Sequence, residues 1–484
     1  MSLYKNLFKQ TAIYGIATVV PRMFSFLLTP LYTSPGVMDL DQYGKVSIIF
    51  SWIIFFNVLL AYGMETAFFR FYNSEDKKQV ISTSTISLIW SSVIFLSLAL
   101  LGRNYLAAVL GIEPEYITYT IWVLVLDALV IIPFSLLRAQ GRPIFYAFIK
   151  VGNVVFNLLL NVFFLLWLPK MAQDPDSFFA TIYTPDFEVG YVFIANVLAS
   201  FATLLALAPH YLRLSWHFNR ELWKRMMHYS LPVMVAGIAY AINESFSRPL
   251  MQYMNVPESE IGTYSACYRL TLFMTLFTTA YRLGIEPFFF SQAGNDNAKQ
   301  TYATVTRYFV IFGSVIFLGV VAFADVFKWI LLRDKAFWEA MDVVPFVILG
   351  SFFLGIYTNL SVWYKLSDQT KMGAYISLLG AVVTLVFNIA LIPIWSYMGS
   401  AIGSVMAYGT MMVVSYKLGA KYYPIPYNVR RMTFYTGVAI LLACMSFYIP
   451  ILRSTYIFGI AAFAGYIWLV YKLEKDSLLK FIKK

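Results

Sequence analysis

Eight ionisable side chains lie within long apolar stretches of the sequence, where a charge is costly. They comprise four arginines and four carboxylates: Arg22, Arg248, Arg269, Arg282, Glu65, Asp127, Glu244 and Glu286. Each costs about 2.5–3.5 kcal/mol at the centre of a bilayer, so exposing all of them to lipid would cost on the order of 20 kcal/mol. We therefore expect these groups to pair with one another or to face a hydrated cavity.

The four arginines are candidates for binding an anionic ligand, because a guanidinium matches two phosphate oxygens at once and keeps its charge at physiological pH. Arg22 and Arg269 have no acidic residue three or four positions away in the sequence, which favours substrate contact for them. Arg248 and Arg282 have such neighbours. Their spacing leaves open either substrate contact or an ion pair on one helix face.

The carboxylates are candidates for ion coupling. Asp127 falls in the middle of its apolar stretch and Glu65 towards one end. Glu244 lies four residues before Arg248, and Glu286 lies four residues after Arg282, so each can form an ion pair on one helix face. A carboxylate held away from water can exchange a proton or bind a cation. A structural alternative is that Asp127 forms an ion pair with Arg22.

One apolar stretch carries a polar stripe. Asn153, Asn157 and Asn161 are spaced by four residues, and Lys150 precedes them by about one turn. A stripe of this kind is typical of interhelical hydrogen bonding. The functional alternative is that Asn153 and Asn157 line a path for substrate.

The elements that carry these residues are membrane-spanning helices. The chain has 484 residues, of which 60% are hydrophobic and only 13% charged, about half the charged fraction of a soluble domain. Apolar runs of roughly twenty residues recur along the chain, long enough to cross a ~30 Å hydrocarbon core as helices. Their spacing predicts an all-α polytopic membrane protein with about fourteen spans. The first run, 11–33, is too long for the core of a signal peptide.

The basic residues are distributed unevenly between the two sides of the predicted membrane. Loops on the side of the termini hold 25 Lys and Arg residues, and loops on the other side hold seven. The positive-inside rule then predicts that both termini are cytoplasmic. The net charge of +11 is thus explained by topology, and nucleic-acid binding is disfavoured.

The chain also repeats itself. Gln42-Tyr43-Gly44 matches Glu260-Ile261-Gly262, and Val155-Phe156-Asn157 matches Val386-Phe387-Asn388. A parallel repeat of six spans is common among transporters. We predict a six-helix lobe at 1–210, an interfacial linker helix at 211–228, a second lobe at 229–420, and two further helices with a basic tail at 421–484.

No pattern for catalysis stands out. The sequence has two cysteines and three histidines and no metal-ligand spacing or phosphate-binding loop, so we expect no metal and no cofactor apart from a coupling H⁺ or Na⁺. A membrane glycosyltransferase or polymerase is the enzymatic alternative. It usually needs large outer loops, whereas the longest one predicted here is 169–188.

Several short motifs resemble the multidrug/oligosaccharidyl-lipid/polysaccharide (MOP) exporter superfamily, in its Wzx-type polysaccharide-transport branch. They are the opening segment from Asn6 to Gly15, Pro21-Arg22, Pro30-Leu31-Tyr32-Thr33, Asp41-Gln42-Tyr43-Gly44 and Gln140-Gly141-Arg142. Their order and the span layout extend the resemblance over the whole chain.

The resemblance implies a V-shaped pair of six-helix lobes with alternating access. It implies an undecaprenyl-diphosphate-linked oligosaccharide as substrate, in a bacterial inner membrane, carried by a monomer that can associate with polysaccharide polymerase and assembly proteins. Two alternatives in the same superfamily are a cation-coupled drug antiporter and a lipid II flippase. The absence of an intramembrane arginine in the second span disfavours lipid II, and the extra pair of spans disfavours the drug antiporter.

Overall fold

The computed structural model describes residues 19–292, 296–367 and 369–482, and within these ranges all regular elements are helices. The predicted all-α fold class is therefore confirmed. Of the motifs that carry the family resemblance, the opening segment from Asn6 to Gly15 lies outside the described residues.

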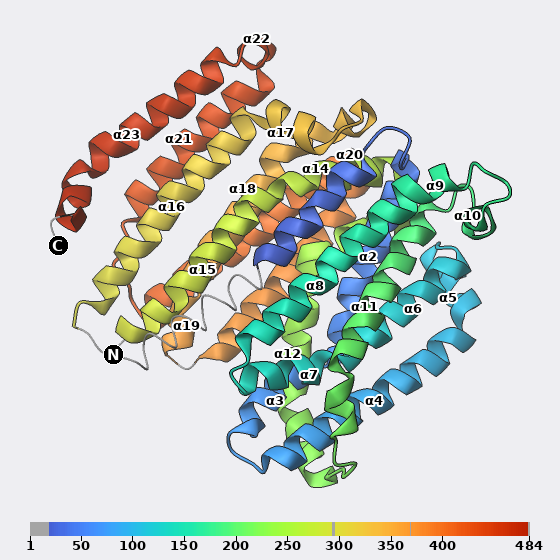
Figure 1. Cartoon of the computed structure of the whole chain (residues 1–484). Helices are drawn as coiled ribbons and strands as arrows, with labels where there is room; N and C mark the ends of the chain where they lie inside the picture. Colours follow the sequence, from blue (N-terminus) through green and yellow to red (C-terminus); the bar gives the residue numbers. More distant parts are fainter. Residues whose placement is uncertain (1–18, 293–295, 368, 483–484) are drawn as a thin grey trace. The chain divides into compact units, whose positions relative to one another are not determined.

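The chain divides into two compact units, unit 1 at 1–265 and unit 2 at 266–484. Unit 1 begins with the described helix Val19–Tyr32. The remaining elements of unit 1 are α2 (Leu40–Ala61), α3 (Met64–Tyr72), α4 (Lys77–Leu101), α5 (Arg103–Leu110), α6 (Pro114–Leu129), α7 (Ile131–Ala139), α8 (Pro143–Val162), the π-helix η1 (Phe163–Trp167), α9 (Leu168–Met171), α10 (Phe178–Ile182), α11 (Glu188–Leu212), α12 (Arg220–Ser245), α13 (Ser247–Tyr253) and the first part of α14 (Glu258–Tyr268) (Figure 1).

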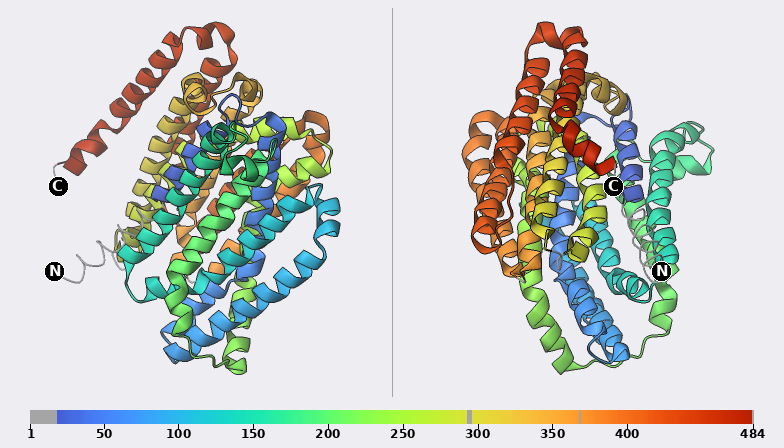
Figure 2. Two further views of the ribbon diagram at one scale, coloured as in Figure 1. Left: turned by 45° about the vertical axis from the view of Figure 1, so that its right-hand side comes forward. Right: turned by 90° about the vertical axis from the view of Figure 1, so that its left-hand side faces the viewer.

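Unit 2 contains the end of α14 and the elements that follow it. They are the 3₁₀ helix η2 (Arg269–Thr271), α15 (Leu272–Gln292), α16 (Ala298–Ala322), α17 (Ala324–Leu331), the 3₁₀ helix η3 (Lys335–Val343), α18 (Val344–Leu360), α19 (Val362–Leu366), α20 (Thr370–Tyr422), α21 (Val429–Tyr448), α22 (Pro450–Ser454) and α23 (Ile457–Ile482). The last two long helices, α21 and α23, form a hairpin through α22 at the C-terminal end of the chain (Figure 2).

Among the described residues, ten helical segments are long and apolar enough to cross a membrane, and Val19–Tyr32 is a shorter apolar helix. The segment Lys371–Tyr422 covers two predicted spans in one assigned helix. Its backbone is non-helical at Trp395 and Ser396, where Ser396 has a φ of 47°. The predicted break between the spans at 372–394 and 399–420 therefore coincides with a sharp kink.

The linker between the predicted lobes differs from the expected single helix at 211–228. Helix α11 continues to Leu212, the chain is then non-helical at 214–219, and α12 starts at Arg220. Asn219 caps α12 by accepting a hydrogen bond from the backbone N–H of Leu222 at 3.0 Å. Ser82 Oγ on α4 donates to the carbonyl of His217 at 2.7 Å. The local cap at Asn219 fixes the start of α12, and the tertiary hydrogen bond from Ser82 uses a linker carbonyl that a continuous helix would need.

Helix α12 belongs to unit 1 although the repeat predicts it to open the second lobe. Its Leu222 and Met226 are buried in one cluster with Met64 and Phe68 of α3. At the turn between α2 and α3, Gly63 has a φ of 71°, and a Cβ there would lie 2.4 Å from the carbonyl oxygen of Ser230. This close approach ties α12 to α3. The boundary between the compact units, after Ser265, therefore differs from the boundary between the predicted lobes, at 211–228. The division into two six-helix lobes stays a prediction.

Candidate functional site

A polar cluster in unit 1 surrounds Asp127. Asp127 on α6 accepts a hydrogen bond from Ser200 Oγ on α11 at 2.8 Å. Asn57 on α2 hydrogen-bonds to the same carboxyl group, and Lys150 on α8 lies close enough to attract it. Four helices thus meet around one acidic side chain. A carboxyl group held away from water can take up a proton or a small cation, whereas the hydrogen bonds and the nearby ammonium favour its charged form.

Glu65 lies at the edge of this cluster. Arg138 Nη1 on α7 donates to Glu65 Oε1 on α3 at 2.7 Å, and both side chains are partly exposed. Lys150 is attracted by Glu65 as well as by Asp127, and its ammonium lies 4.3 Å from the centre of the Phe134 ring. Lys150 therefore lies in the electrostatic field of both carboxylates that the sequence singled out in the first lobe, and Arg138 is the cation that pairs directly with Glu65.

The asparagine stripe makes interhelical hydrogen bonds. Asn153 Nδ2 donates to Thr203 Oγ1 on α11 at 2.9 Å. Asn161 Nδ2 donates to Asn157 Oδ1 at 3.0 Å, and Tyr32 Oη donates to Asn161 Oδ1 at 2.8 Å. The stripe thus joins α8 to α11 and to the helix Val19–Tyr32. A role for Asn153 and Asn157 in lining the substrate path stays a prediction.

Three of the four candidate arginines are exposed: Arg22 on the helix Val19–Tyr32, Arg269 at the start of η2, and Arg282 on α15. Arg248 on α13 is half-buried. Its Nε donates to Ser265 Oγ at 3.0 Å, and its guanidinium carbon lies 5.7 Å from the centre of the Tyr264 ring.

The structure describes only part of the two predicted ion pairs, Glu244–Arg248 and Arg282–Glu286. Glu244 is half-buried near the end of α12, and a helix break at Phe246 separates it from Arg248. The side chain of Glu286 lies outside the described residues. Whether the predicted pairs Glu244–Arg248 and Arg282–Glu286 form stays a prediction.

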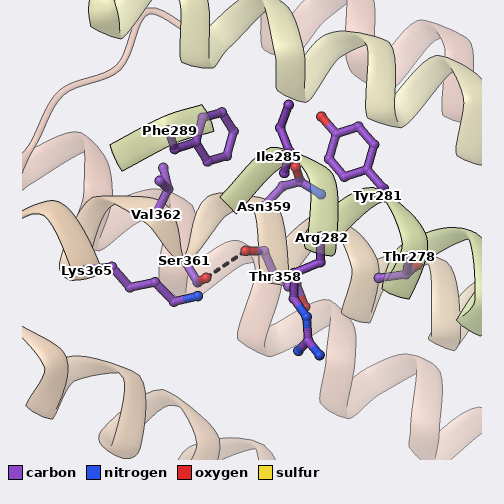
Figure 3. A pocket seen from close by; sticks show the side chains of 10 residues that line it. All are labelled: Thr278, Tyr281, Arg282, Ile285, Phe289, Thr358, Asn359, Ser361, Val362 and Lys365. Carbon is purple, nitrogen blue, oxygen red and sulfur yellow. Dashed lines mark hydrogen bonds between the residues drawn. The ribbon is translucent and has the colours of Figure 1, made fainter. Parts of the chain in front are cut away.

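Arg282 lines a narrow pocket in unit 2 together with Lys365 of α19, Asn359 of α18 and several apolar side chains (Figure 3). The Oδ1 of Asn359 and the Oγ1 of Thr278 are buried without a hydrogen-bond partner among the described residues. The pocket encloses about 20 Å³, which is room for one water molecule or one ligand oxygen. It can therefore hold a single polar atom, and it is too small for a sugar; the Arg282 guanidinium points away from the other labelled side chains (Figure 3).

Two glycines bring α2 and α14 into backbone contact within unit 1. A Cβ on Gly44 would lie 2.1 Å from the carbonyl oxygen of Glu258, and a Cβ on Gly262 would lie 2.0 Å from the carbonyl oxygen of Leu40. Only glycine permits this approach. The two positions are the ones that the predicted repeat matches with each other.

Charged groups surround the same contact. Lys45 on α2 forms ion pairs with Glu113, which precedes α6, and with Glu258, whose Oε2 lies 3.8 Å from the Lys45 ammonium. Burial raises the pKa of Glu258 above its usual range, although Lys45 opposes the shift. The glycines and Lys45 together hold one end of α2 against the start of α14.

Sequence reasoning missed several members of these sites. Ser200 and Asn57 join Asp127 only through tertiary packing, and Arg138 was counted as an ordinary loop charge. Asn359 and Lys365 had no distinguishing spacing. Lys150 was the one residue near Asp127 that the sequence did single out, because it lies one turn before the asparagine stripe and at the edge of the same apolar run.

The long apolar helices of the described residues define a multi-pass membrane protein, and two family models place it among transporters of the MOP superfamily. The chain belongs to the polysaccharide biosynthesis protein family, whose model matches residues 7–281. The MatE family model also matches residues 232–390. The family resemblance stated from the sequence is thereby confirmed.

Solved structures share this fold at low sequence identity. A structure of the lipid II flippase MurJ in an inward closed conformation has a TM-score of 0.74 at 12% identity, covering 95% of this chain and 99% of that one. An inward-facing multidrug resistance MATE transporter of the MOP superfamily has a TM-score of 0.63 at 15% identity, covering 87% and 96%. The multidrug transporter DinF-BH has a TM-score of 0.62 at 16% identity, with the same coverage. No curated protein matches the sequence.

Proposed function

We propose that this transporter moves an undecaprenyl-diphosphate-linked oligosaccharide, such as an O-antigen, capsule or exopolysaccharide unit, from the inner to the outer leaflet of the bacterial inner membrane. The observation that carries the proposal is the match of the polysaccharide biosynthesis family model to more than half of the chain. Polysaccharide units are assembled on lipid carriers, so a transporter in this family implies a lipid-linked substrate.

The exposed arginines support an anionic headgroup as the ligand. Arg22, Arg269 and Arg282 stay exposed on helices that are otherwise largely apolar. Facing lipid would cost about 2.5–3.5 kcal/mol for each, so an aqueous or ligand-filled surface is the stable environment. Each guanidinium can bind two oxygens of a diphosphate.

The uneven distribution of basic residues supports a direction of transport. It predicts that both termini are cytoplasmic and that the α2–α14 contact lies at the outer end of the spans. Closure at that end supports substrate entry from the cytoplasmic side. The inside-negative potential then favours outward passage of the diphosphate by about 2.3 kcal/mol per charge per 100 mV.

Replacing Arg22, Arg269 or Arg282 by alanine is expected to lower surface polysaccharide by about tenfold or more, because a lost charge-assisted contact to phosphate costs about 1.5–3 kcal/mol. The measurement is polysaccharide export in a deletion strain complemented with each variant. The control is Arg103→Ala, which removes an exposed cation from α5, outside the predicted spans.

Membrane levels of all variants must match the wild-type protein. Unchanged export in all three variants would contradict the assignment of these arginines to substrate binding. Unchanged surface polysaccharide after deletion of the gene would overturn the proposed function itself.

The MatE match at 232–390 favours a second candidate, a cation-coupled small-molecule antiporter. Deletion of the gene would then lower drug tolerance and leave surface polysaccharide intact. The MurJ fold match raises the further alternative of a lipid II flippase, for which deletion would stop peptidoglycan synthesis.

We propose that Asp127 couples transport to an H⁺ or Na⁺ gradient, because hydrogen-bonding groups and a cation from three other helices converge on it. Asp127→Asn is expected to abolish the gradient-stimulated part of transport in proteoliposomes, since an amide cannot take up either cation. Asp41→Asn, at the exposed start of α2, is the matched control. Gradient stimulation that survives in Asp127→Asn would assign coupling elsewhere, with Glu65, Glu244 and Glu286 as the remaining candidates.

A monomeric state and association with polysaccharide polymerase and assembly proteins stay predictions.

A further inference from the structure

Unit 2 contains a second, much larger cavity, of about 380 Å³, between α16, α18, α20 and α21. Its walls are almost entirely apolar and include Phe353, Ile356, Met412, Val413, Met432 and Ile440. The volume falls in the range of ligand sites, and an apolar cavity of this kind does not hold ordered water well.

The cavity exists because the four helices pack as two pairs. Helix α18 packs along α20, and α16 packs along α21, with α16 and α18 in contact (Figure 1). Helix α21 buries Tyr435 and Ala439 on its packed face. The face of α21 that lines the cavity carries Gly437, whose missing side chain widens the space, because a Cβ there would meet no described atom within 4 Å.

The cavity opens between two membrane spans. Val413 on α20 and Val429 on α21 both line it and are both exposed. Since α20 and α21 are long and apolar enough to cross the bilayer, the opening lies against hydrocarbon chains.

Two exposed basic side chains lie close to the residues at one end of the opening. Lys417 follows Val413 by one turn of α20, and Arg430 follows Val429 in the first turn of α21; both are exposed. The N-terminus of α21, capped by Asn428, lies at the same end. Two cations beside a helix N-terminus favour a phosphate group.

We propose that this cavity binds an anionic phospholipid of the surrounding leaflet, with one acyl chain between α18, α20 and α21 and the phosphate beside Lys417 and Arg430. Burial of the chain supplies affinity that does not depend on the headgroup, and the two cations supply selectivity for negative charge. The site is separate from the arginines assigned to the substrate and does not depend on the identity of that substrate.

The test is lipid binding to the full-length protein by native mass spectrometry, with phosphatidylglycerol and phosphatidylcholine of identical acyl chains as probes. Gly437→Leu, which fills the cavity, is expected to lower the binding of both lipids by about tenfold. Gly465→Leu is the matched control: Gly465 lies on α23 away from the cavity, and a Cβ there also meets no described atom within 4 Å.

The double variant Lys417→Gln/Arg430→Gln changes only exposed side chains and so keeps the proposal testable if Gly437→Leu does not fold. It is expected to remove the preference for phosphatidylglycerol over phosphatidylcholine and to leave binding of the neutral lipid unchanged. Equal losses in Gly437→Leu and Gly465→Leu, or a preference for phosphatidylglycerol that survives the double variant, would overturn the proposal. So would tighter binding of undecaprenyl phosphate than of phosphatidylglycerol at the cavity, which would make it a prenyl-chain site.

Discussion

Replacing Gly44 by alanine is expected to destabilise unit 1 and to reduce transport about tenfold or more. The added Cβ would lie 2.1 Å from the carbonyl oxygen of Glu258 and 3.2 Å from the backbone nitrogen of Gly262, so backbone and not a flexible side chain stands in its way. Helices α2 and α14 would have to separate. Overpacking of a tight contact costs about 1–3 kcal/mol, and a collision with backbone belongs at the upper end of that range.

Gly262→Ala should behave in the same way, because its Cβ would lie 2.0 Å from the carbonyl oxygen of Leu40. The two substitutions disrupt one contact, so the double variant should lose less stability than the sum of the single variants. Melting temperature in detergent and export in complemented cells are the measurements. Gly152→Ala on α8, where a Cβ meets no described atom within 4 Å, is the matched control and should be neutral or slightly stabilising.

The same variants can be used to test whether the α2–α14 contact closes the outer end of the transporter during transport. If α2 and α14 must close at the predicted outer end in each cycle, the alanine variants should make that end more accessible to a membrane-impermeant thiol reagent, with Asp41→Cys at the exposed start of α2 as the reporter position. Wild-type stability together with wild-type export in Gly44→Ala and Gly262→Ala would rule out a required backbone contact.

The second large effect is expected at Glu474. This carboxylate on α23 has a side chain that is only 1% exposed. It accepts a hydrogen bond from Tyr435 Oη at 2.8 Å. Its oxygens also lie 3.4 Å from Arg307 Nη2 and 3.6 Å from Arg431 Nη1. One buried carboxylate thus holds the α21–α23 hairpin to α16.

Glu474→Ala is expected to destabilise the packing of α23 on α16 and α21 by about 3–5 kcal/mol, because Arg307 would keep its charge in a mostly buried position without this counter-ion. Hydrogen exchange of α23 and limited proteolysis should report the loss. Glu474→Gln keeps an acceptor for Tyr435 and should cost less. Lys475→Ala alters the exposed neighbouring residue and is the matched control.

If the ion pairs with Arg307 and Arg431 carry the effect, Glu474→Leu combined with Arg307→Leu should recover part of the stability lost in Glu474→Ala, since a packed apolar pair can replace a buried ion pair. Wild-type exchange rates for α23 in Glu474→Ala would show that other contacts hold the helix in place.

The charges in unit 2 show where sequence reasoning reached its limit. Arg307 and Glu474 each lie close to an end of an apolar run, and no local spacing distinguishes either residue. The structure extends α16 and α23 past those runs and buries the two side chains against each other. A carboxylate 167 positions away in the chain cannot be found from local spacing.

The cluster around Asp127 shows the same limit of sequence reasoning. The sequence singled out Asp127 because a carboxylate inside an apolar run is costly at bilayer depth. It also singled out the asparagine stripe, whose spacing of four follows the pitch of a helix. It could not identify Ser200, Asn57 or Arg138 as neighbours, because serine, asparagine and a terminal arginine are ordinary in membrane helices and loops.

The sequence by itself determined the class of the protein, because a lipid environment requires long apolar helices that are visible in local composition, and its short motifs indicated the family. The predicted number of about fourteen spans stays a prediction, since ten long apolar helices and one shorter one are found among the described residues. Only the tertiary structure decided which helices meet, where α12 packs, and which side chains surround Asp127 and Glu474. The physical reason is that helix formation depends on neighbours a few residues away, whereas a buried charge is stabilised by groups that the fold brings together from distant parts of the chain.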